Sequence, residues 1–282
     1  MNICNAADFE WGLNVPHRPG EARTKRLINR SGHLKGLKVG VSRVLGEKTT
    51  PRHHHNFDQL RIGLAGVLDF GLHQKLVARS IMYVPAGTWY GPENWHGPDH
   101  KDATMAAIFQ FDGDCQSGML NTVEIDAATD ELKKRGEFRD GFYWPNEPGK
   151  LRAIDAYEAS YELASGRKIE YPPAFINEPI YMNIDARSWV PSPEPGVEVK
   201  MLGAWGNYGL RLGMSKIARG KDHALFNTRQ ELVAFCLSGE AVVNGKPFVE
   251  YSAMLLEPGE TAIATGVSDA TEFIEVALPN FQ

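Results

Sequence analysis

The chain has 282 residues, of which 43% are hydrophobic and 23% are charged, and its formal net charge is −5 at neutral pH. This composition excludes a disordered chain, a fibre and a coiled coil, and the length allows one large domain or two of about 140 residues. The acidic balance gives no general attraction for nucleic acid or an anionic membrane, so neither is an expected partner.

The number and spacing of the cysteines and the length of the apolar runs indicate the cellular compartment. Cys4, Cys115 and Cys236 are few and far apart, which fits a reducing compartment better than a disulfide framework. No run of about eighteen apolar residues occurs, and the start has no basic stretch followed by an apolar one. We therefore expect a cytoplasmic protein.

Strand patterns come first along the chain. Apolar residues occupy alternate positions from Leu37 to Val41 and again from Leu60 to Leu64, as in strands with one buried face. The runs are short, and Pro-Gly, Asn-Gly and Gly-Pro pairs separate them. Many short strands joined by turns predict an all-β sandwich or jelly-roll barrel rather than an α/β sheet.

Two short helices are expected next. One runs roughly from Ala127 to Arg135 and ends at Gly136. The other follows apolar residues at helical spacing, with Gly166 as its stop; these residues are Leu151, Ile154, Tyr157, Tyr161 and Ala164. The linker between the two halves of the chain is expected near residues 145–185.

The second half of the chain repeats the first. GLKVGVSRV begins at Gly36 and GLRLGMSKI at Gly209, an offset of 173 that Pro85 and Pro258 reproduce. The duplication predicts two tandem jelly-roll barrels with a short helical linker. We place the N-terminal barrel at 1–145, the linker at 146–185 and a degenerate C-terminal barrel at 186–282.

The histidines cluster in the first copy, where six of the nine lie within 48 residues. They are His53, His54, His55, His73, His96 and His100. A strand carries His53 and His55 on one face and His54 on the other, so the first two can share one ion.

These residues resemble motifs of the cupin superfamily. His53-x-His55-x3-Gln59-x6-Gly66 resembles the first cupin motif, and Pro85-x-Gly87-x2-Tyr90 resembles the second. With the duplication, the chain resembles a two-domain cupin, or bicupin. The resemblance implies jelly-roll (RmlC-like) barrels, and cupin relatives commonly form dimers, so a homodimer is expected.

The resemblance implies a divalent metal held by two histidines, a glutamate and a third histidine. Here His53 and His55 stand at the histidine positions, Gln59 replaces the glutamate and Tyr90 replaces the last histidine. Gln59 brings no charge and a protonated phenol is a poor ligand, so His96 is a candidate substitute. Fe, Mn, Ni, Zn or Co would suit the imidazoles, and a metal-free barrel is an equally open alternative.

Strand parity adds candidate catalytic residues. Arg61 shares the inner face with the histidines, either as a clamp for a substrate carboxylate or in an ion pair with Asp58 or Asp69. Tyr83 shares parity with Pro85, so its hydroxyl is a candidate donor to a substrate oxygen. Tyr90 is the third catalytic candidate.

The function expected of the first barrel is that of a metal-dependent dioxygenase or lyase acting on a small oxygenated or aromatic organic acid, and two alternatives stand beside it. One is a metal-free isomerase, cyclase or dehydratase that uses Tyr90 and a histidine for proton transfer. The other is a binding module that captures a small molecule without changing it.

The second barrel has lost these residues. His223 keeps the first histidine position, but Leu225, Leu232 and Ile263 stand at the positions of His55, Gln59 and Tyr90. No metal site is expected there.

Overall fold

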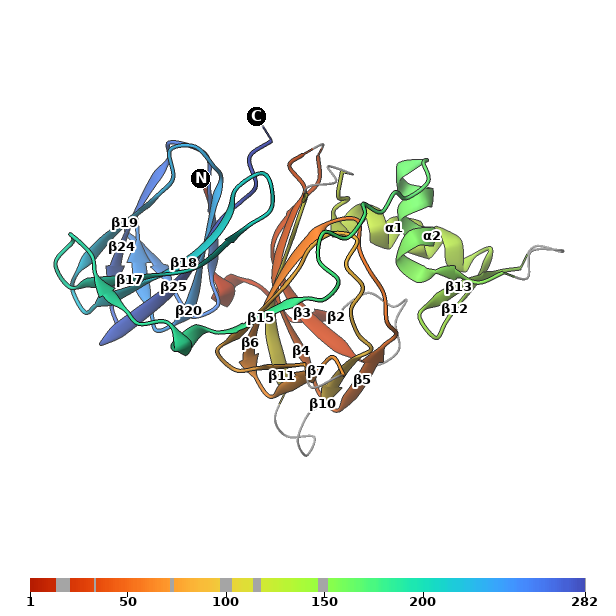
Figure 1. The fold of residues 1–282 in the computed structure, drawn as a ribbon, viewed down its shortest axis with the longest axis horizontal. Helices are drawn as coiled ribbons and strands as arrows, with labels where there is room; N and C mark the ends of the chain where they lie inside the picture. Colours follow the sequence, from red (N-terminus) through yellow and green to blue (C-terminus); the bar gives the residue numbers. More distant parts are fainter. Residues whose placement is uncertain are drawn as a thin grey trace. The chain divides into compact units, whose positions relative to one another are not determined.

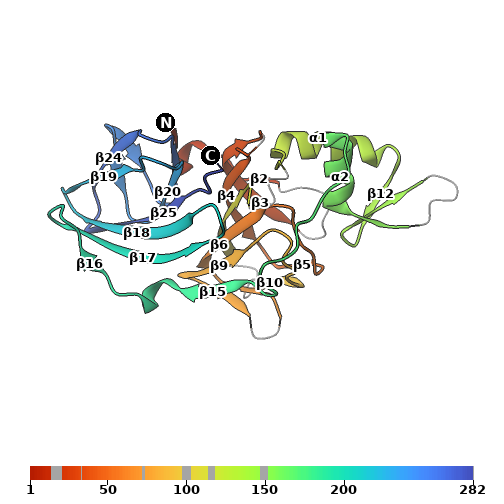
Figure 2. The ribbon, with the colours of Figure 1, turned by 45° about the horizontal axis from the view of Figure 1, so that its top comes forward.

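The structure is a computed structural model that describes residues 1–13, 21–32, 34–71, 74–96, 103–113, 118–146 and 152–281. The chain forms two compact units (Figures 1 and 2), Trp11–Met182 and Met1–Glu10 together with Asn183–Gln282. The expected linker up to Met182 thus belongs to the first unit, and the first ten residues belong to the second. Both units are built from antiparallel sheets, which confirms the predicted all-β fold.

Two antiparallel sheets form the barrel of the first unit. The seven-stranded sheet has the order β15-β9-β6-β11-β4-β3-β2, and the four-stranded sheet has the order β5-β10-β7-β8. The strands are β2 (Gly12–Leu13), β3 (Ala22–Arg30), β4 (Leu37–Val44), β5 (Glu47–Thr50), β6 (Asp58–Ala65), β7 (Val67–Asp69), β8 (Lys75–Val77), β9 (Ser80–Val84), β10 (Glu93–His96), β11 (Thr104–Phe111) and β15 (Ile180–Asn183).

Alternation along these strands separates an apolar face from a polar one. Val39, Leu60 and Phe109 lie on one face of the large sheet, and each is at most 1% exposed. They share that face because β11 pairs with both β4 and β6, with Phe109 opposite Val39 and Leu60. Burial of this apolar face stabilises the sheet and directs the intervening residues towards the interior of the barrel.

Two helices and a small sheet complete the first unit. Helix α1 (Thr122–Lys133) and helix α2 (Ala156–Ser165) lie side by side, next to β12 (Gly136–Arg139), β13 (Phe142–Pro145) and β14 (Ile154–Asp155) (Figure 1). Helix α1 begins five residues earlier than expected because Asn121 and Glu124 form a capping box. Helix α2 ends at Gly166, which adopts the left-handed conformation with φ 69°.

The second unit repeats the two-sheet plan. Its sheets have the orders β1-β23-β20-β25-β18-β17-β16 and β19-β24-β21-β22. The strands are β1 (Asn2–Cys4), β16 (Val190–Pro191), β17 (Val197–Trp205), β18 (Leu210–Ala218), β19 (Asp222–Phe226), β20 (Leu232–Ser238), β21 (Ala241–Val243), β22 (Lys246–Phe248), β23 (Ala253–Leu256), β24 (Thr261–Gly266) and β25 (Ala270–Ala277); short 3-10 turns lie at Ala6–Asp8 and Ile184–Ala186. Pairing of β1 with β23 is what brings the first residues into this unit.

Leu225 and Leu232, which stand at two former site positions, are part of the apolar core of this second barrel. None of the helices in the described residues combines the length and apolar character needed to cross a membrane.

Candidate active site

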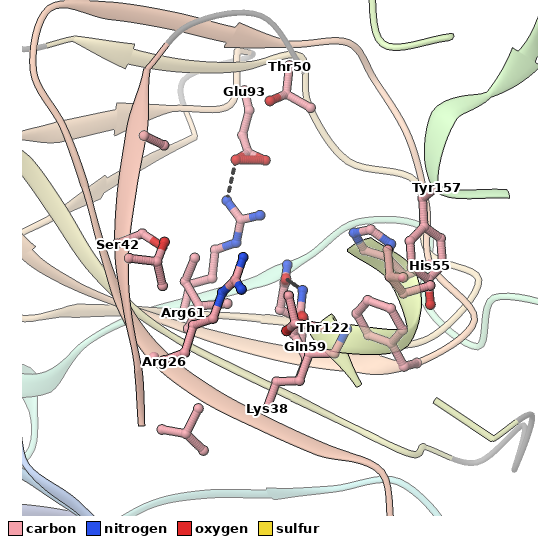
Figure 3. A pocket seen from close by; sticks show the side chains of 18 of the residues that line it. Arg26, Lys38, Ser42, Thr50, His55, Gln59, Arg61, Glu93, Thr122 and Tyr157 are labelled. Atoms are coloured by element: carbon pink, nitrogen blue, oxygen red, sulfur yellow. Dashed lines mark hydrogen bonds and ion pairs between the residues drawn. The ribbon is translucent and has the colours of Figure 1, made fainter. Parts of the chain in front are cut away.

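A cavity of about 210 Å³ opens inside the first barrel. Its polar lining consists of Thr24, Arg26, Lys38, Ser42, Lys48, Thr50, His53, His55, Gln59, Arg61, Glu93, Gln110 and Thr122. One row of this lining crosses three adjacent strands, because Gln110 on β11 pairs with Gln59 on one side and with Lys38 on the other. Figure 3 shows Lys38 and Gln59 of this row among the side chains that line the cavity.

Backbone hydrogen bonds join the two predicted motifs. His53 and Tyr90 form an isolated antiparallel bridge in which each N–H donates to the carbonyl of the other at 3.0 Å. The Gly87 N–H donates to the carbonyl of His55 at 2.8 Å. Gly87 has a φ of 80°, and a side chain there would collide with the carbonyl oxygen of Pro172, so glycine is required at this crossing.

His53 has a defined tautomer. Its Nδ1 lies 2.7 Å from the carbonyl oxygen of Pro51, which can only accept a hydrogen bond. Nδ1 therefore carries the proton, and the lone pair of the neutral ring is on Nε2. The ring is 6% exposed and lines the cavity. A buried imidazole held in this way can accept a proton at Nε2.

The Tyr90 hydroxyl is the centre of the polar cluster. Its oxygen lies 2.9 Å from His55 Nε2, 3.1 Å from Gln59 Nε2 and 3.3 Å from Arg61 Nη2. The amide and guanidinium nitrogens can only donate, so the phenol oxygen accepts both bonds and its own proton goes to His55 Nε2. Neutral His55 consequently carries its ring proton on Nδ1.

Gln110 fixes the orientation of Gln59. The Gln110 Nε2 donates to Gln59 Oε1 at 2.8 Å, which leaves the amide N–H of Gln59 facing Tyr90. Gln59 is 0% exposed. It therefore presents a hydrogen-bond donor to the centre of the cluster, where a metal ligand would present an oxygen.

Arg61 pairs with Glu93, a residue that the sequence analysis did not single out. Arg61 Nη1 lies 2.6 Å from Glu93 Oε1, and the two side chains are 6% and 5% exposed. Burial alone would lower the pKa of Arg61, but the Glu93 carboxylate more than offsets this and raises it. Trp95 Nε1 donates to the same carboxylate oxygen at 3.2 Å.

The expected partners of Arg61 lie elsewhere. Asp58 is on the opposite face of β6, where its carboxylate accepts a hydrogen bond from the Ala86 N–H at 2.9 Å. Asp69 bonds to the Gly71 N–H and lies 3.8 Å from Lys75. The choice between Asp58 and Asp69 is thus corrected to Glu93, and the guanidinium is already committed to a carboxylate of the protein.

Tyr83 lies outside the cavity lining. Its side chain is 0% exposed, and its hydroxyl donates to Asp58 Oδ2 at 2.7 Å. The reason is the strand register, which places Tyr83 opposite Leu60 and therefore on the apolar face of the sheet. The expectation that this hydroxyl reaches a substrate is corrected accordingly.

The neighbouring aromatic residues divide between two surfaces. His54 points away from His53, as parity predicts, and its ring stacks on Trp89 with centroids 4.0 Å apart. Trp95 lines the cavity. Phe57 and Tyr157 form an apolar end of the cavity, and burial raises the pKa of Tyr157 well above its usual value. That phenol stays protonated at neutral pH.

His96 ends strand β10, where its backbone pairs with Glu47 and Val67. Its side chain lies outside the described part of the structure, as do His17, His33, His73, His100 and Cys115. Within the described residues, no group of three or more His, Cys, Asp or Glu side chains could hold a metal ion.

The chemistry of the donors around Tyr90 does not fit a divalent metal. Gln59 directs an N–H rather than an oxygen to the centre, and the phenol proton is given to the nitrogen of His55 that would bind the ion. The Arg61 guanidinium lies 3.3 Å from the same phenol oxygen and would repel a cation. A divalent ion there would lack an anionic ligand and would face N–H donors where it needs acceptors.

The former site in the second barrel holds a different arrangement. His223 Nδ1 bonds to Glu194, and its Nε2 lies 3.6 Å from Glu275. Burial lowers the pKa of His223, but the two carboxylates raise it more. Ile263 is 43% exposed, so the position equivalent to Tyr90 does not face the interior.

Comparison with known proteins finds similarity in structure alone. No family model and no curated protein matches the sequence. The fold is similar to a putative dioxygenase of Nostoc punctiforme, with a TM-score of 0.59 and 12% identity over 100% of this chain and 84% of the other. It is also similar to the bacterial pirin YhhW of Escherichia coli, solved with nickel(II), with a TM-score of 0.56 and 8% identity over 99% of both chains.

A third similar structure is the oxalate decarboxylase of Bacillus subtilis. The TM-score is 0.56 and the identity 12%, over 98% of this chain and 76% of the other. Identities this low establish a shared architecture and leave the chemistry to be argued from the residues of the site.

Proposed function

Because the chain has the two-barrel cupin fold, we propose that its first barrel is a metal-free active site that transfers protons on a small oxygenated or aromatic organic acid. The reaction class is isomerisation, cyclisation or dehydration. The observation that carries the proposal is the hydrogen bonding of Tyr90, whose oxygen receives two N–H donors and gives its proton to His55.

This arrangement stabilises the ionised form of the phenol. Arg61 supplies a positive charge and Gln59 a neutral donor, and both bonds strengthen when Tyr90 loses its proton. The Glu93 carboxylate accepts a hydrogen bond from the guanidinium and holds it in place. Tyr90 and His55 therefore act as one unit that can release a proton and take it back.

The two histidines have complementary roles in this mechanism. His53 accepts a proton from the substrate at Nε2, because Pro51 holds the ring proton on Nδ1. His55 returns a proton from Nδ1 while the Tyr90 proton moves to its Nε2. The substrate then gains one proton where it lost another. Before the next turnover the proton held by His53 passes to Nδ1 of the neighbouring His55, and the Nε2 proton of His55 returns to Tyr90, which restores the starting state.

The test is proton exchange catalysed in deuterium oxide. NMR would follow hydrogen exchange into a panel of small oxygenated and aromatic acids, with the enzyme treated with a chelator beforehand. Loss of the hydroxyl in Tyr90→Phe should slow exchange by roughly 10²–10⁴-fold. Tyr208→Phe, in the second unit, is the matched control and should exchange at the wild-type rate.

Three results would contradict the proposal. Tyr90→Phe could keep the wild-type rate, which would exclude a catalytic phenol. Chelation could abolish exchange and added metal restore it, which would favour the dioxygenase or metal-dependent lyase. Panel acids could bind tightly without any exchange, which would favour a binding module.

A further inference from the structure

The basic side chains that line the cavity differ in whether a carboxylate of the protein neutralises them. Arg61 pairs with Glu93 at 2.6 Å, and Arg26 pairs with Asp126 at 3.1 Å. Lys38 also lines the cavity, yet no carboxylate in the described part of the chain lies within 4.0 Å of its ammonium group. Lys38 thus adds a positive charge that its described surroundings leave without an ion pair.

The position of Lys38 in the sheet relates it to the proposed reaction centre. It occupies the same cross-strand row as Gln110 and Gln59, and Gln59 donates a hydrogen bond to Tyr90. Lys38 and Gln59 are both labelled in Figure 3. Two strand spacings, roughly 10 Å, separate the backbone of Lys38 from that of Gln59. A small molecule lying along this row would have one end at Lys38 and the other near the Tyr90 cluster.

Apolar side chains make up another part of the cavity lining. Phe57, Trp95, Ile108, Ile125 and Tyr157 all line the cavity. Such a lining suits an aromatic or aliphatic body, while the few polar groups fix its orientation.

We propose that Lys38 binds the carboxylate of the substrate and so makes the first barrel specific for organic monoacids over their neutral analogues. The proposal rests on the function proposed above and adds the group that recognises the acid. It also gives the carboxylate-binding role to Lys38 in place of Arg61, whose charge is met by Glu93.

The charged groups around Lys38 support this role. The pKa of Lys38 is lowered to about 8, chiefly by burial and to a smaller extent by Arg26, although Asp126 and Glu124 on helix α1 act in the opposite direction. The two helix carboxylates do not fully compensate the burial. A bound carboxylate would supply the missing charge and raise the pKa again.

The experiment compares acids with amides of the same shape. Calorimetry at pH 7 would measure the binding of acetate, benzoate and cinnamate, and of the three corresponding carboxamides. At least one acid should bind the wild-type protein about tenfold or more tightly than its amide. The affinity for that acid should fall by about tenfold between pH 7 and pH 9, as free Lys38 loses its proton.

Three variants locate the effect. Lys38→Met should abolish the preference for acid over amide, and Lys38→Arg should retain it because the charge is kept. Lys35→Met is the matched control, since Lys35 is exposed and lies three residues upstream. It should leave binding unchanged.

The proposal fails if no acid binds, if acid and amide bind alike, or if Lys38→Met keeps the preference. These outcomes are independent of catalysis. Lys38-dependent binding of acids without any proton exchange would refute the proposed function and leave this inference standing. Proton exchange that depends on Tyr90, combined with equal binding of acid and amide, would refute this inference and leave the proposed function standing.

Discussion

Glu93→Gln removes the negative charge that faces the Arg61 guanidinium inside the first barrel. The two side chains are 6% and 5% exposed, so solvent cannot take over the role of the carboxylate. Breaking a buried ion pair by removing one partner costs about 3–5 kcal/mol. Arg61 keeps its bond to Tyr90 and lies 5.5 Å from the centre of the Phe70 ring, which favours the lower end, about 3 kcal/mol.

For a unit of this size, a loss of about 3 kcal/mol lowers the melting temperature by roughly 6–12 °C. Circular dichroism would follow unfolding, and hydrogen exchange of the β6 amides would assign the loss to the unit Trp11–Met182. Arg61→Met combined with Glu93→Gln should cost less than the sum of the single changes, because the double variant leaves no unpaired charge.

Asp130→Asn is the matched control for charge removal. Asp130 pairs with Lys133 at 2.8 Å, but the side chains are 71% and 41% exposed, so the melting temperature should stay within about 1 °C of wild type. If Glu93→Gln has the same melting temperature as the control, the Arg61 guanidinium is not left buried and unpaired by the change. The conclusion that Glu93 neutralises a buried charge is then refuted.

Two further substitutions test assignments made from the structure. Tyr83→Phe removes the donor to Asp58 Oδ2 and should destabilise the first unit by about 1–3 kcal/mol with proton exchange intact; a stable variant without exchange would return Tyr83 to the active site. His223→Gln tests the second unit, where burial lowers the pKa of His223 and Glu275 and Glu194 raise it above 6.5 overall. The protonated ring thus contributes stability that is fully present below pH 6.5 and lost as the pH rises through the folded-state pKa. Wild-type melting temperature should therefore fall between pH 6 and pH 8, and the variant should lack this slope; equal slopes in thermal melts would contradict it.

The inner face of β6 and the duplication could both be predicted from the sequence alone. Alternation along one strand places Gln59 and Arg61 on one side whatever the strand pairs with. The same rule excludes Asp58 as the partner of Arg61, because residues three apart in a strand point to opposite faces.

Residues whose position depends on strand register could not be placed from the sequence. The interior or exterior position of Tyr83 depends on its alignment with Leu60, which only the pairing of β9 and β6 determines. Glu93 lies in a segment, GPENWHGP, whose glycines and prolines predict a turn. It nevertheless begins strand β10, because the distant strands β5 and β7 pair with that strand. Non-local pairing of this kind leaves no local pattern.

The residues that depart from the metal-binding pattern all make the site less favourable for a cation. A metal site surrounds a cation with acceptors, whereas Gln59 and Arg61 here direct donors at the oxygen of Tyr90. The same N–H groups that would weaken the binding of a cation stabilise a phenolate. Loss of the glutamate alone would merely leave a poor metal site. Together with the inward N–H groups of Gln59 and Arg61, it leaves a site that offers hydrogen-bond donors where a cation needs acceptors. Lys38 extends this set of donors along the wall, so a ligand that suits the whole cavity must carry acceptors at the reaction centre and a negative charge at the far end of the row.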